Sequence, residues 1–158
     1  MAIAAKTSKD VMDAISKENI RVVDIKFTDL YGQWQHFSLP IEGFSEDVFE
    51  EGLGFDGSSI RGFKTIDTSD MVLLPDATTA FVDPACAAQT LSLIADVVEP
   101  VTFEKFSRDP RQVAKKAIEY LQSTGIADQA YVGPEAEFFV FDSVSYETGS
   151  YFYSYAID

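Results

Sequence analysis

The sequence predicts an α+β fold, in which a small mixed β-sheet precedes the beginning of a second, α/β domain. Three observations carry this prediction. Apolar and polar residues alternate over residues 21–28, short apolar runs follow between residues 71 and 98, and a strong helix signal opens at Asp109. The 158 residues include 13 Phe and 7 Tyr, and 46% are hydrophobic, so the chain can bury a sizeable core.

The first predicted elements are a capped helix and a β-hairpin. Thr7 or Ser8 is a suitable N-cap for a helix whose apolar residues recur on one face. The alternation over residues 21–28 predicts a half-buried strand. Residues 29–32 are typical of a hairpin turn, and residues 33–39 are expected to return as the second strand.

A short helix and further strands are expected next. Ser45 is a candidate N-cap for a helix over residues 45–51, and Gly52 suits the C-terminal end of this helix. Phe44 and Phe49 occupy the two positions of a hydrophobic staple. Three apolar runs then predict strands of a small mixed sheet: residues 71–74, 79–82 and 90–98. Strand, hairpin strand, helix and further strands are the element order of a β-grasp unit.

The second domain is predicted to follow a boundary between residues 104 and 105, which divides the chain into 1–104 and 105–158. Its first helix has Asp109 as N-cap, Pro110 at the first position and Gln112 placed to close a capping box.

We expect this helix to end at Gly125 and to bury an apolar stripe. The stripe consists of Val113, Ala114, Ala117, Ile118 and Leu121. Residues 131–141 predict a strand, and residues 150–157 are its expected partner.

Composition excludes several classes of function. The formal net charge of −14 argues against a basic surface for nucleic acid, and no apolar run is long enough to span a membrane. We therefore expect a cytoplasmic protein. The single cysteine, Cys86, excludes an internal disulfide and a zinc–thiolate cluster, and we expect it to be a small core residue.

The glycine-rich stretch from residue 52 to residue 73 is the first candidate functional region. It places one carboxylate, Asp56, beside two hydroxyls, Ser58 and Ser59, in a segment too long for a simple turn. Residue types alone leave a second interpretation open, in which this is a surface Ω-loop whose Asp and Ser side chains merely bond nearby backbone groups.

Glu135 and Glu137 form the second candidate region. They are two residues apart on a predicted strand, so both side chains project from the same face. The apolar side chains around them predict a largely buried region, where two carboxylates require a shared proton or a cation, and oxygen-only ligands favour Mg²⁺ or Mn²⁺. The alternative is a solvated strand edge. For His36, the only histidine, we expect a structural or exposed role.

Two motifs carry a family resemblance. Residues 55–59 (FDGSS), then Thr68, Ser69 and Asp70 after eight residues and Leu73 after two more, resemble the N-terminal signature of glutamine synthetase. Residues 133–139 (GPEAEFF) are similar to that family's first metal-binding strand. The similarity extends along nearly the whole chain and is greatest to the bacterial class I enzymes.

The resemblance implies a β-grasp N-terminal domain, followed by the start of a catalytic domain. It also implies ATP-dependent ligation of ammonia to the side-chain carboxylate of glutamate, through a γ-glutamyl phosphate. Asp56 matches the family residue that binds ammonium and takes its proton, and Ser59 lines the same pocket. Glu137 resembles a ligand of the glutamate-side metal, and Glu135 a ligand of the metal that bridges ATP phosphates. The family builds its sites between neighbouring subunits of a homo-oligomeric ring, here expected to be a dodecamer.

The chain departs from the family in length. The remaining metal ligands, the arginines that bind glutamate and phosphate, and most of the ATP pocket lie downstream in the family, so we expect the chain alone to be inactive. It ends at Asp158 in an apolar stretch, which indicates an interruption. Two other readings stay open: a non-catalytic fragment that acts as an assembly or interaction module, and a related γ-glutamyl-amine synthetase.

Overall fold

The computed structural model describes residues 3–158, which form a five-stranded mixed sheet with helices and a separate two-stranded hairpin. The elements in chain order are α1 (Ser8–Lys17), β1 (Val22–Thr28), β2 (Trp34–Pro40), η1 (Ile41–Gly43), α2 (Val48–Glu51), β3 (Leu53–Asp56), η2 (Gly57–Ser59), η3 (Ile66–Thr68), β4 (Asp70–Val82), β5 (Thr90–Val98), α3 (Pro110–Ser123), β6 (Val144–Thr148) and β7 (Tyr153–Ile157). The α+β fold and the β-grasp order of elements are confirmed.

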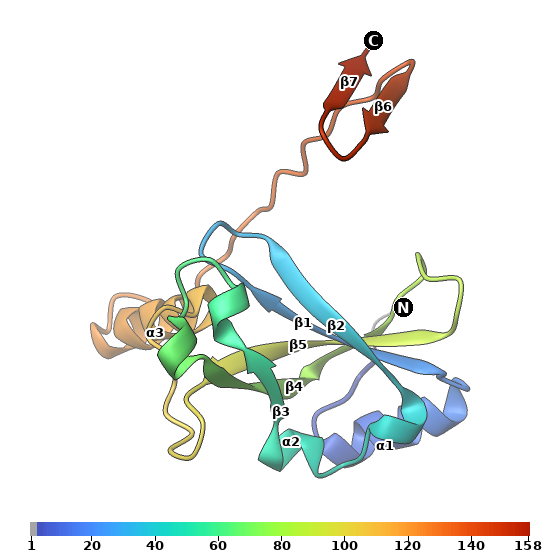
Figure 1. Ribbon diagram of the computed structural model, residues 1–158. Coiled ribbons are helices and arrows are strands. Elements are labelled where there is room, and N and C mark those ends of the chain that lie inside the picture. The colour runs from blue at the N-terminus through green and yellow to red at the C-terminus, as the bar shows by residue number, and fades with distance from the viewer. Residues whose placement is uncertain (1–2) are drawn as a thin grey trace. The chain divides into compact units, whose positions relative to one another are not determined.

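The strand order of the main sheet is β2-β1-β5-β4-β3. β5 is central, because it pairs parallel with β1 and antiparallel with β4. Consecutive side chains of β5 are buried, so both faces of this strand are covered, and its sequence is correspondingly rich in apolar residues. α1 and α2 lie on one side of the sheet, and α3 lies near one end of β4 and β5 (Figure 1).

The hydrophobic core lies between the sheet and α1 and α2. It includes Val11 and Ile15 of α1, Val23, Ile25 and Phe27 of β1, and Leu91, Leu93 and Val97 of β5, all at most 6% exposed. Each fully buried aliphatic side chain of this kind contributes about 1.5–3 kcal/mol to the free energy of folding. The core therefore fixes the sheet on which the first candidate site is built.

Most helix ends agree with the sequence. The Thr7 side chain accepts a hydrogen bond from the Asp10 backbone N–H, and the Asp10 side chain completes a capping box. Asp109 caps α3, with Pro110 as its first residue, and Gly125 follows the helix with a φ of 69°. Gly52 ends α2 with a φ of 73°.

Two predictions about caps are wrong. α2 begins at Val48 and not at Ser45, although the Phe44 and Phe49 rings do meet, with centroids 5.8 Å apart. Gln112 is buried, but its Oε1 has no hydrogen-bond partner, so it closes no capping box.

The predicted buried stripe of α3 is also wrong. Val113 is 55% and Ile118 is 37% exposed, and Ala114 and Ala117 are exposed as well. Gln112 is the buried residue of this helix. The helix is amphipathic as expected, but residues 3–158 supply no second layer to cover its apolar face.

Two of the predicted apolar runs join into one strand. β4 continues through Pro75, opposite Ala95 of β5, with an irregularity between Asp76 and Phe81. β3 pairs with β4 only as far as Leu53 with Leu73, so no strand lies beside Pro75 on that edge of β4. The missing backbone N–H of Pro75 therefore costs no hydrogen bond to β3. Cys86 is exposed, contrary to prediction, because it lies in the turn between β4 and β5.

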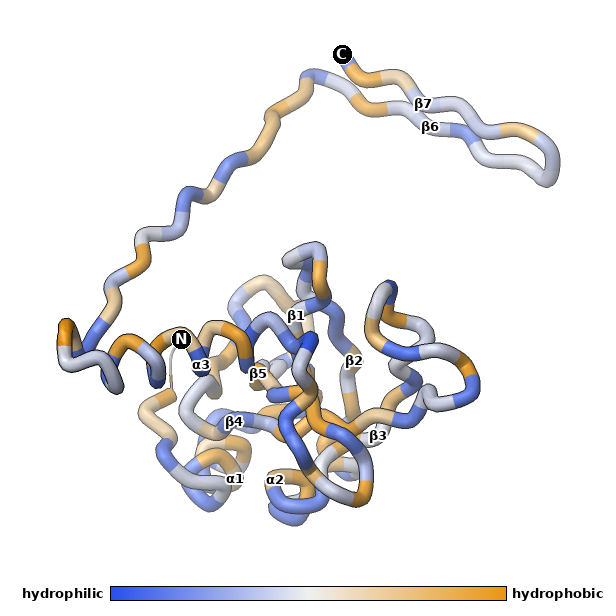
Figure 2. The backbone as a smooth tube through the Cα atoms, turned by 90° about the vertical axis from the view of Figure 1, so that its left-hand side faces the viewer, coloured by the Kyte–Doolittle hydropathy of each residue, from blue (hydrophilic) through white to orange (hydrophobic). Residues whose placement is uncertain are grey.

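The chain divides into two compact units, residues 1–128 and residues 129–158. Each unit is described by itself. The second contains an extended segment without helix or strand and the β6–β7 hairpin, which pairs Tyr146 with Tyr155. Hydrophobic positions (orange) recur along α3 and along the extended segment (Figure 2). The predicted boundary between residues 104 and 105 stays a prediction.

The predicted strand over residues 131–141 is not present, and neither is its pairing with residues 150–157. A strand needs a neighbour for its backbone hydrogen bonds. In the second unit β6 and β7 pair with each other, so the segment has no ladder partner among the described residues.

Candidate functional site

The first candidate site lies where the edge strand β3 ends. Asp56 is the last residue of β3, opposite Asp70 of β4, and the chain then turns into the short helix η2. The predicted glycine-rich loop therefore begins with four residues of regular strand, which carry Asp56 to the edge of the sheet.

The Asp56 carboxylate accepts three hydrogen bonds from its own loop. Ser58 donates its backbone N–H at 2.8 Å and its hydroxyl at 2.6 Å to Oδ1, and the Ser59 hydroxyl donates to Oδ2 at 3.3 Å. The hydroxyl of Ser58 is the largest cause of a lowered Asp56 pKa, and its backbone N–H is the next. The side chain is exposed, so the loop presents an ionised carboxylate to solvent at neutral pH.

Close packing explains the glycine that follows Asp56. A Cβ on Gly57 would lie 2.5 Å from Sδ and 2.7 Å from Cγ of Met71, which is 1% exposed. The Gly57 N–H also donates to the Ser69 carbonyl at 2.7 Å. The backbone beside Asp56 is thus held directly against β4.

Glu135 and Glu137 lie in the second unit, on the extended segment. Both are exposed, and so are their apolar neighbours, with Phe138 at 81% and Val140 at 85%. The expected burial of this region is wrong, because the segment has no covering layer among residues 129–158. The two carboxylates stay two residues apart on an extended backbone, but no strand ladder fixes them.

The donor set at Glu135 and Glu137 suits Mg²⁺ or Mn²⁺ in kind, since it consists of carboxylate oxygens. It does not complete a site. No group of three or more His, Cys, Asp or Glu side chains arranged to hold a metal ion occurs among residues 3–158. The structure brings Asp56 and Ser59 together, while the metal role of Glu135 and Glu137 stays a prediction.

A second polar cluster lies on the sheet face made by β1 and β2. His36 Nδ1 is 2.8 Å from Asp24 Oδ1, and Lys26 Nζ lies 3.1 Å from Asp83 and 3.6 Å from Asp24. The His36 side chain is 59% exposed, in agreement with the expected structural or exposed role. Sequence reasoning missed this cluster, because β1 and β2 bring the groups together only after the hairpin closes.

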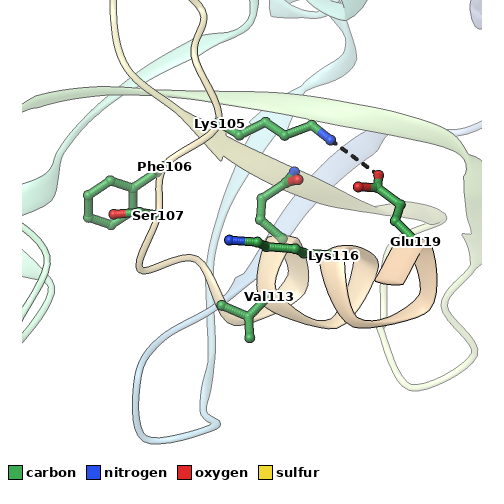
Figure 3. Close-up of a pocket in the computed structure, with 7 residues that line it drawn as sticks. Lys105, Phe106, Ser107, Val113, Lys116 and Glu119 are labelled. Carbon is green, nitrogen blue, oxygen red and sulfur yellow. Dashed lines mark ion pairs between the residues drawn. The ribbon is translucent and has the colours of Figure 1, made fainter. Parts of the chain in front are cut away.

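A hollow of about 430 Å³ lies beside the start of α3. Phe106 and Ser107, which precede the helix, line the hollow together with Val113 and Lys116 of the helix (Figure 3). Lys105 and Glu119, which also line it, form an ion pair of 3.7 Å. None of the predicted site residues lines this hollow. None of the helices described is long and apolar enough to span a membrane.

Two family models match the chain. The glutamine synthetase β-grasp domain matches residues 19–100, and the glutamine synthetase catalytic domain matches residues 107–158. Glutamine synthetase from Mycolicibacterium smegmatis is 57% identical over 146 residues, which are 92% of this chain and 30% of that protein. A 3-hydroxylaminophenol mutase from Cupriavidus pinatubonensis is 49% identical over 142 residues, which are 90% of this chain and 30% of that protein.

The fold is also found among solved structures. Plasmodium falciparum glutamine synthetase, solved by cryo-electron microscopy, superposes with a TM-score of 0.78 at 21% identity, over 99% of this chain and 30% of that chain. The chain spans about a third of the length of the curated relatives it matches. With two consecutive domain models matched in order, the chain belongs to the glutamine synthetase family.

Proposed function

We propose that this chain is the N-terminal part of an ATP-dependent ligase that joins ammonia to the side-chain carboxylate of glutamate. The observation that carries the proposal is the Asp56 carboxylate, which Ser58 and Ser59 hold ionised and exposed at the end of β3. Ammonia is mostly ammonium at neutral pH, and ammonium is not a nucleophile. A fixed anion next to the reacting carbon both concentrates the cation and accepts its proton.

The proposed role of Asp56 has two parts, which are the binding of ammonium and the transfer of its proton. A lowered pKa makes the Asp56 carboxylate a better counter-ion for ammonium and a weaker base. Ammonium binding is therefore the stronger part of the proposal. Ammonium must lose one proton before its nitrogen has a lone pair with which to attack, and a second proton leaves once the nitrogen has bonded to the acyl carbon and its N–H groups have become acidic. Ser59 keeps Oδ2 oriented from the same loop.

Glu135 and Glu137 would hold the divalent metals, Mg²⁺ or Mn²⁺, together with ligands from the rest of the catalytic domain. Such metals, when bound, neutralise charge on the phosphoryl group that ATP transfers to glutamate. The assembly we propose is a cytoplasmic homo-oligomeric ring, a dodecamer, in which the Asp56 loop serves the site of the adjacent subunit.

The proposal is tested with a chimeric enzyme. Residues 1–158 replace the matching part of the Mycolicibacterium smegmatis enzyme, and glutamine formation is measured with glutamate, ATP and ammonium. We expect the chimera to form glutamine and the isolated chain to form none, since two carboxylates alone hold Mg²⁺ weakly. A chimera that assembles without activity would contradict the ligase assignment. Preference for methylamine over ammonium would favour a γ-glutamyl-amine synthetase instead.

A second candidate is an assembly module without catalysis. The observation in its favour is the uncovered apolar face of α3, where Val113 is 55% and Ile118 is 37% exposed. Two results together would favour this function. The isolated chain would co-purify with a full-length subunit, and Asp56→Asn in the chain would leave the activity of that subunit unchanged.

A further inference from the structure

The loop between β3 and β4 has few backbone hydrogen bonds of its own. Residues 57–69 contain the short turns η2 and η3, and the Ile60 and Phe63 N–H groups donate to the carbonyls three residues earlier, at 3.2 Å and 3.0 Å. Such a loop stays in one conformation only if other parts of the protein hold it. Its anchors therefore decide where Asp56 and Ser59 lie.

The first anchor is a buried aromatic side chain. Phe63 is fully buried, and its ring centroid lies 6.3 Å from Phe27 of β1 and 5.1 Å from Phe106. Phe106 is 4% exposed and belongs to the segment between β5 and α3. The tip of the loop is thus packed against a residue more than forty positions further along the chain.

The second anchor is polar. Arg108 donates from Nη1 to the carbonyl of Gly62 at 2.6 Å. Gly62 has a φ of 84°, a backbone conformation that favours glycine, and it lies beside Leu30 of the β1–β2 turn. Beside it, Lys64 Nζ lies 2.7 Å from both carboxylate oxygens of Glu99.

These anchors connect the two regions matched by the family models. Gly62 and Phe63 belong to the β-grasp match, whereas Arg108 belongs to the catalytic-domain match. Two consecutive hydrogen-bonded turns, Gly57–Ile60 and Ile60–Phe63, connect the anchored tip to Ser59 and Asp56. A shift at Gly62 is therefore expected to change the geometry of the carboxylate.

We propose that Arg108 is a positioning residue for the ammonium-binding loop. By holding the Gly62 carbonyl, it fixes the Asp56 loop to the first residues of the catalytic domain, so the carboxylate is presented in one orientation before ammonium arrives. The inference rests on the ligase function proposed above. It adds a specific role in ammonium affinity for a residue that lies outside the Asp56 loop.

The first test uses the chain itself and needs no activity. In Arg108→Met the aliphatic stem remains but the donor is lost, and Arg108→Lys restores a donor. We expect backbone amide exchange at Ile60 and Phe63, followed by NMR, to become about three- to tenfold faster in Arg108→Met, as for the loss of one hydrogen bond. Arg108→Lys should lie close to the wild type. Arg21→Met, which removes an exposed arginine outside this loop, is the matched control.

The second test uses the chimeric enzyme. We expect Arg108→Met to raise KM for ammonium about three- to tenfold, with KM for ATP and glutamate unchanged and with recovery in Arg108→Lys. Equal increases for all three substrates, or unchanged loop exchange, would overturn the positioning role. A parent chimera that forms no glutamine would refute the proposed function and the ammonium role, while the exchange experiment still decides whether Arg108 anchors the loop.

Discussion

At the scale of single residues, the role we propose for Asp56 depends on the nucleophile. In the chimeric enzyme we expect Asp56→Asn to slow glutamine formation from ammonium on the order of a hundred- to ten-thousand-fold. Asn keeps the size and can still accept the Ser58 hydrogen bond, but it has neither the charge nor the basicity. Hydroxylamine is uncharged near neutral pH, so the defect should lessen when it replaces ammonium. Rates with the two nucleophiles are compared in the same assay.

Glu137→Gln is the contrasting variant. In the proposed role of Glu137 as a metal ligand, the substitution slows phosphoryl transfer, which precedes attack by either nucleophile, so both rates should fall by the same factor. If Asp56→Asn also reduces both rates equally, the carboxylate has no role in handling the proton, and its contribution is to the structure of the loop.

Gly57, in the loop between β3 and β4, has too little space for a side chain. We expect Gly57→Ala to lower the free energy of unfolding by about 1–3 kcal/mol, because the new methyl group overpacks against the buried Met71 side chain. Gly54→Ala is the matched control, because Gly54 lies three residues earlier, in β3, and a Cβ there meets nothing within 4 Å. Urea unfolding of the 158-residue chain measures both. Equal stability of the two variants would show that Met71 yields without cost.

What the sequence predicts about single residues depends on where their partners lie. Caps such as Thr7 and Asp109 bond to groups two or three positions away, so their roles were predictable. Cys86 and Gln112 depend on their tertiary surroundings, and both predictions failed. Arg108 gave no local signal at all, because its acceptor is 46 residues away.

At the scale of elements, α3 is attached to the sheet by an ion cluster. Arg111 lies 2.5 Å from Asp76 of β4 and 2.5 Å from Asp96 of β5, and Lys115 lies 2.6 Å from Asp96. Burial alone raises the pKa of Asp76, but hydrogen bonds from Arg111 and Thr78 outweigh it and leave the pKa below 3.8. Asp76 therefore stabilises the fold at neutral pH, and this contribution is lost as the pH falls below 4.

We expect Arg111→Met to lower the free energy of unfolding at pH 7 by about 1–3 kcal/mol, because Asp76 loses its cationic partner and Asp96 keeps only Lys115. The difference from the wild type should shrink as the pH falls below 4 and Asp76, whose pKa is lowered in the folded state, becomes protonated. Urea unfolding at a series of pH values measures it, with Lys116→Met, an exposed cation of the same helix, as the control. A difference that is constant with pH would exclude the ion pairs as its cause.

Elements were predictable where both partners of a pairing lie within the chain. The β1–β2 hairpin and the mixed pairing of β5 follow from alternation and apolar runs, and both are present. The predicted strand over residues 131–141 and the buried face of α3 are periodic in sequence but lack neighbours here. Periodicity specifies which face an element would bury, and only a second layer provides the burial.

At the scale of the whole molecule, burial is confined to the first unit. All buried hydrophobic residues among those described lie between Ala5 and Phe106. Residues 129–158 contain one two-stranded hairpin with every residue exposed, and an isolated hairpin is marginally stable in water. The two units should therefore differ greatly in their resistance to local unfolding.

Limited proteolysis tests this difference. Chymotrypsin cleaves after aromatic residues, and the second unit exposes Tyr131, Phe138, Phe139, Tyr151 and Tyr153 at 79% or more of their surface. We expect rapid cleavage there, while a folded fragment that contains residues 1–128 survives and keeps the circular dichroism signal of the first unit. Phe27 and Phe63 are at most 3% exposed, so cleavage at these residues requires global unfolding and should appear only when urea is added. Early cleavage at Phe63 would contradict the anchored Asp56 loop as well, because the same burial protects the residue and fixes the loop.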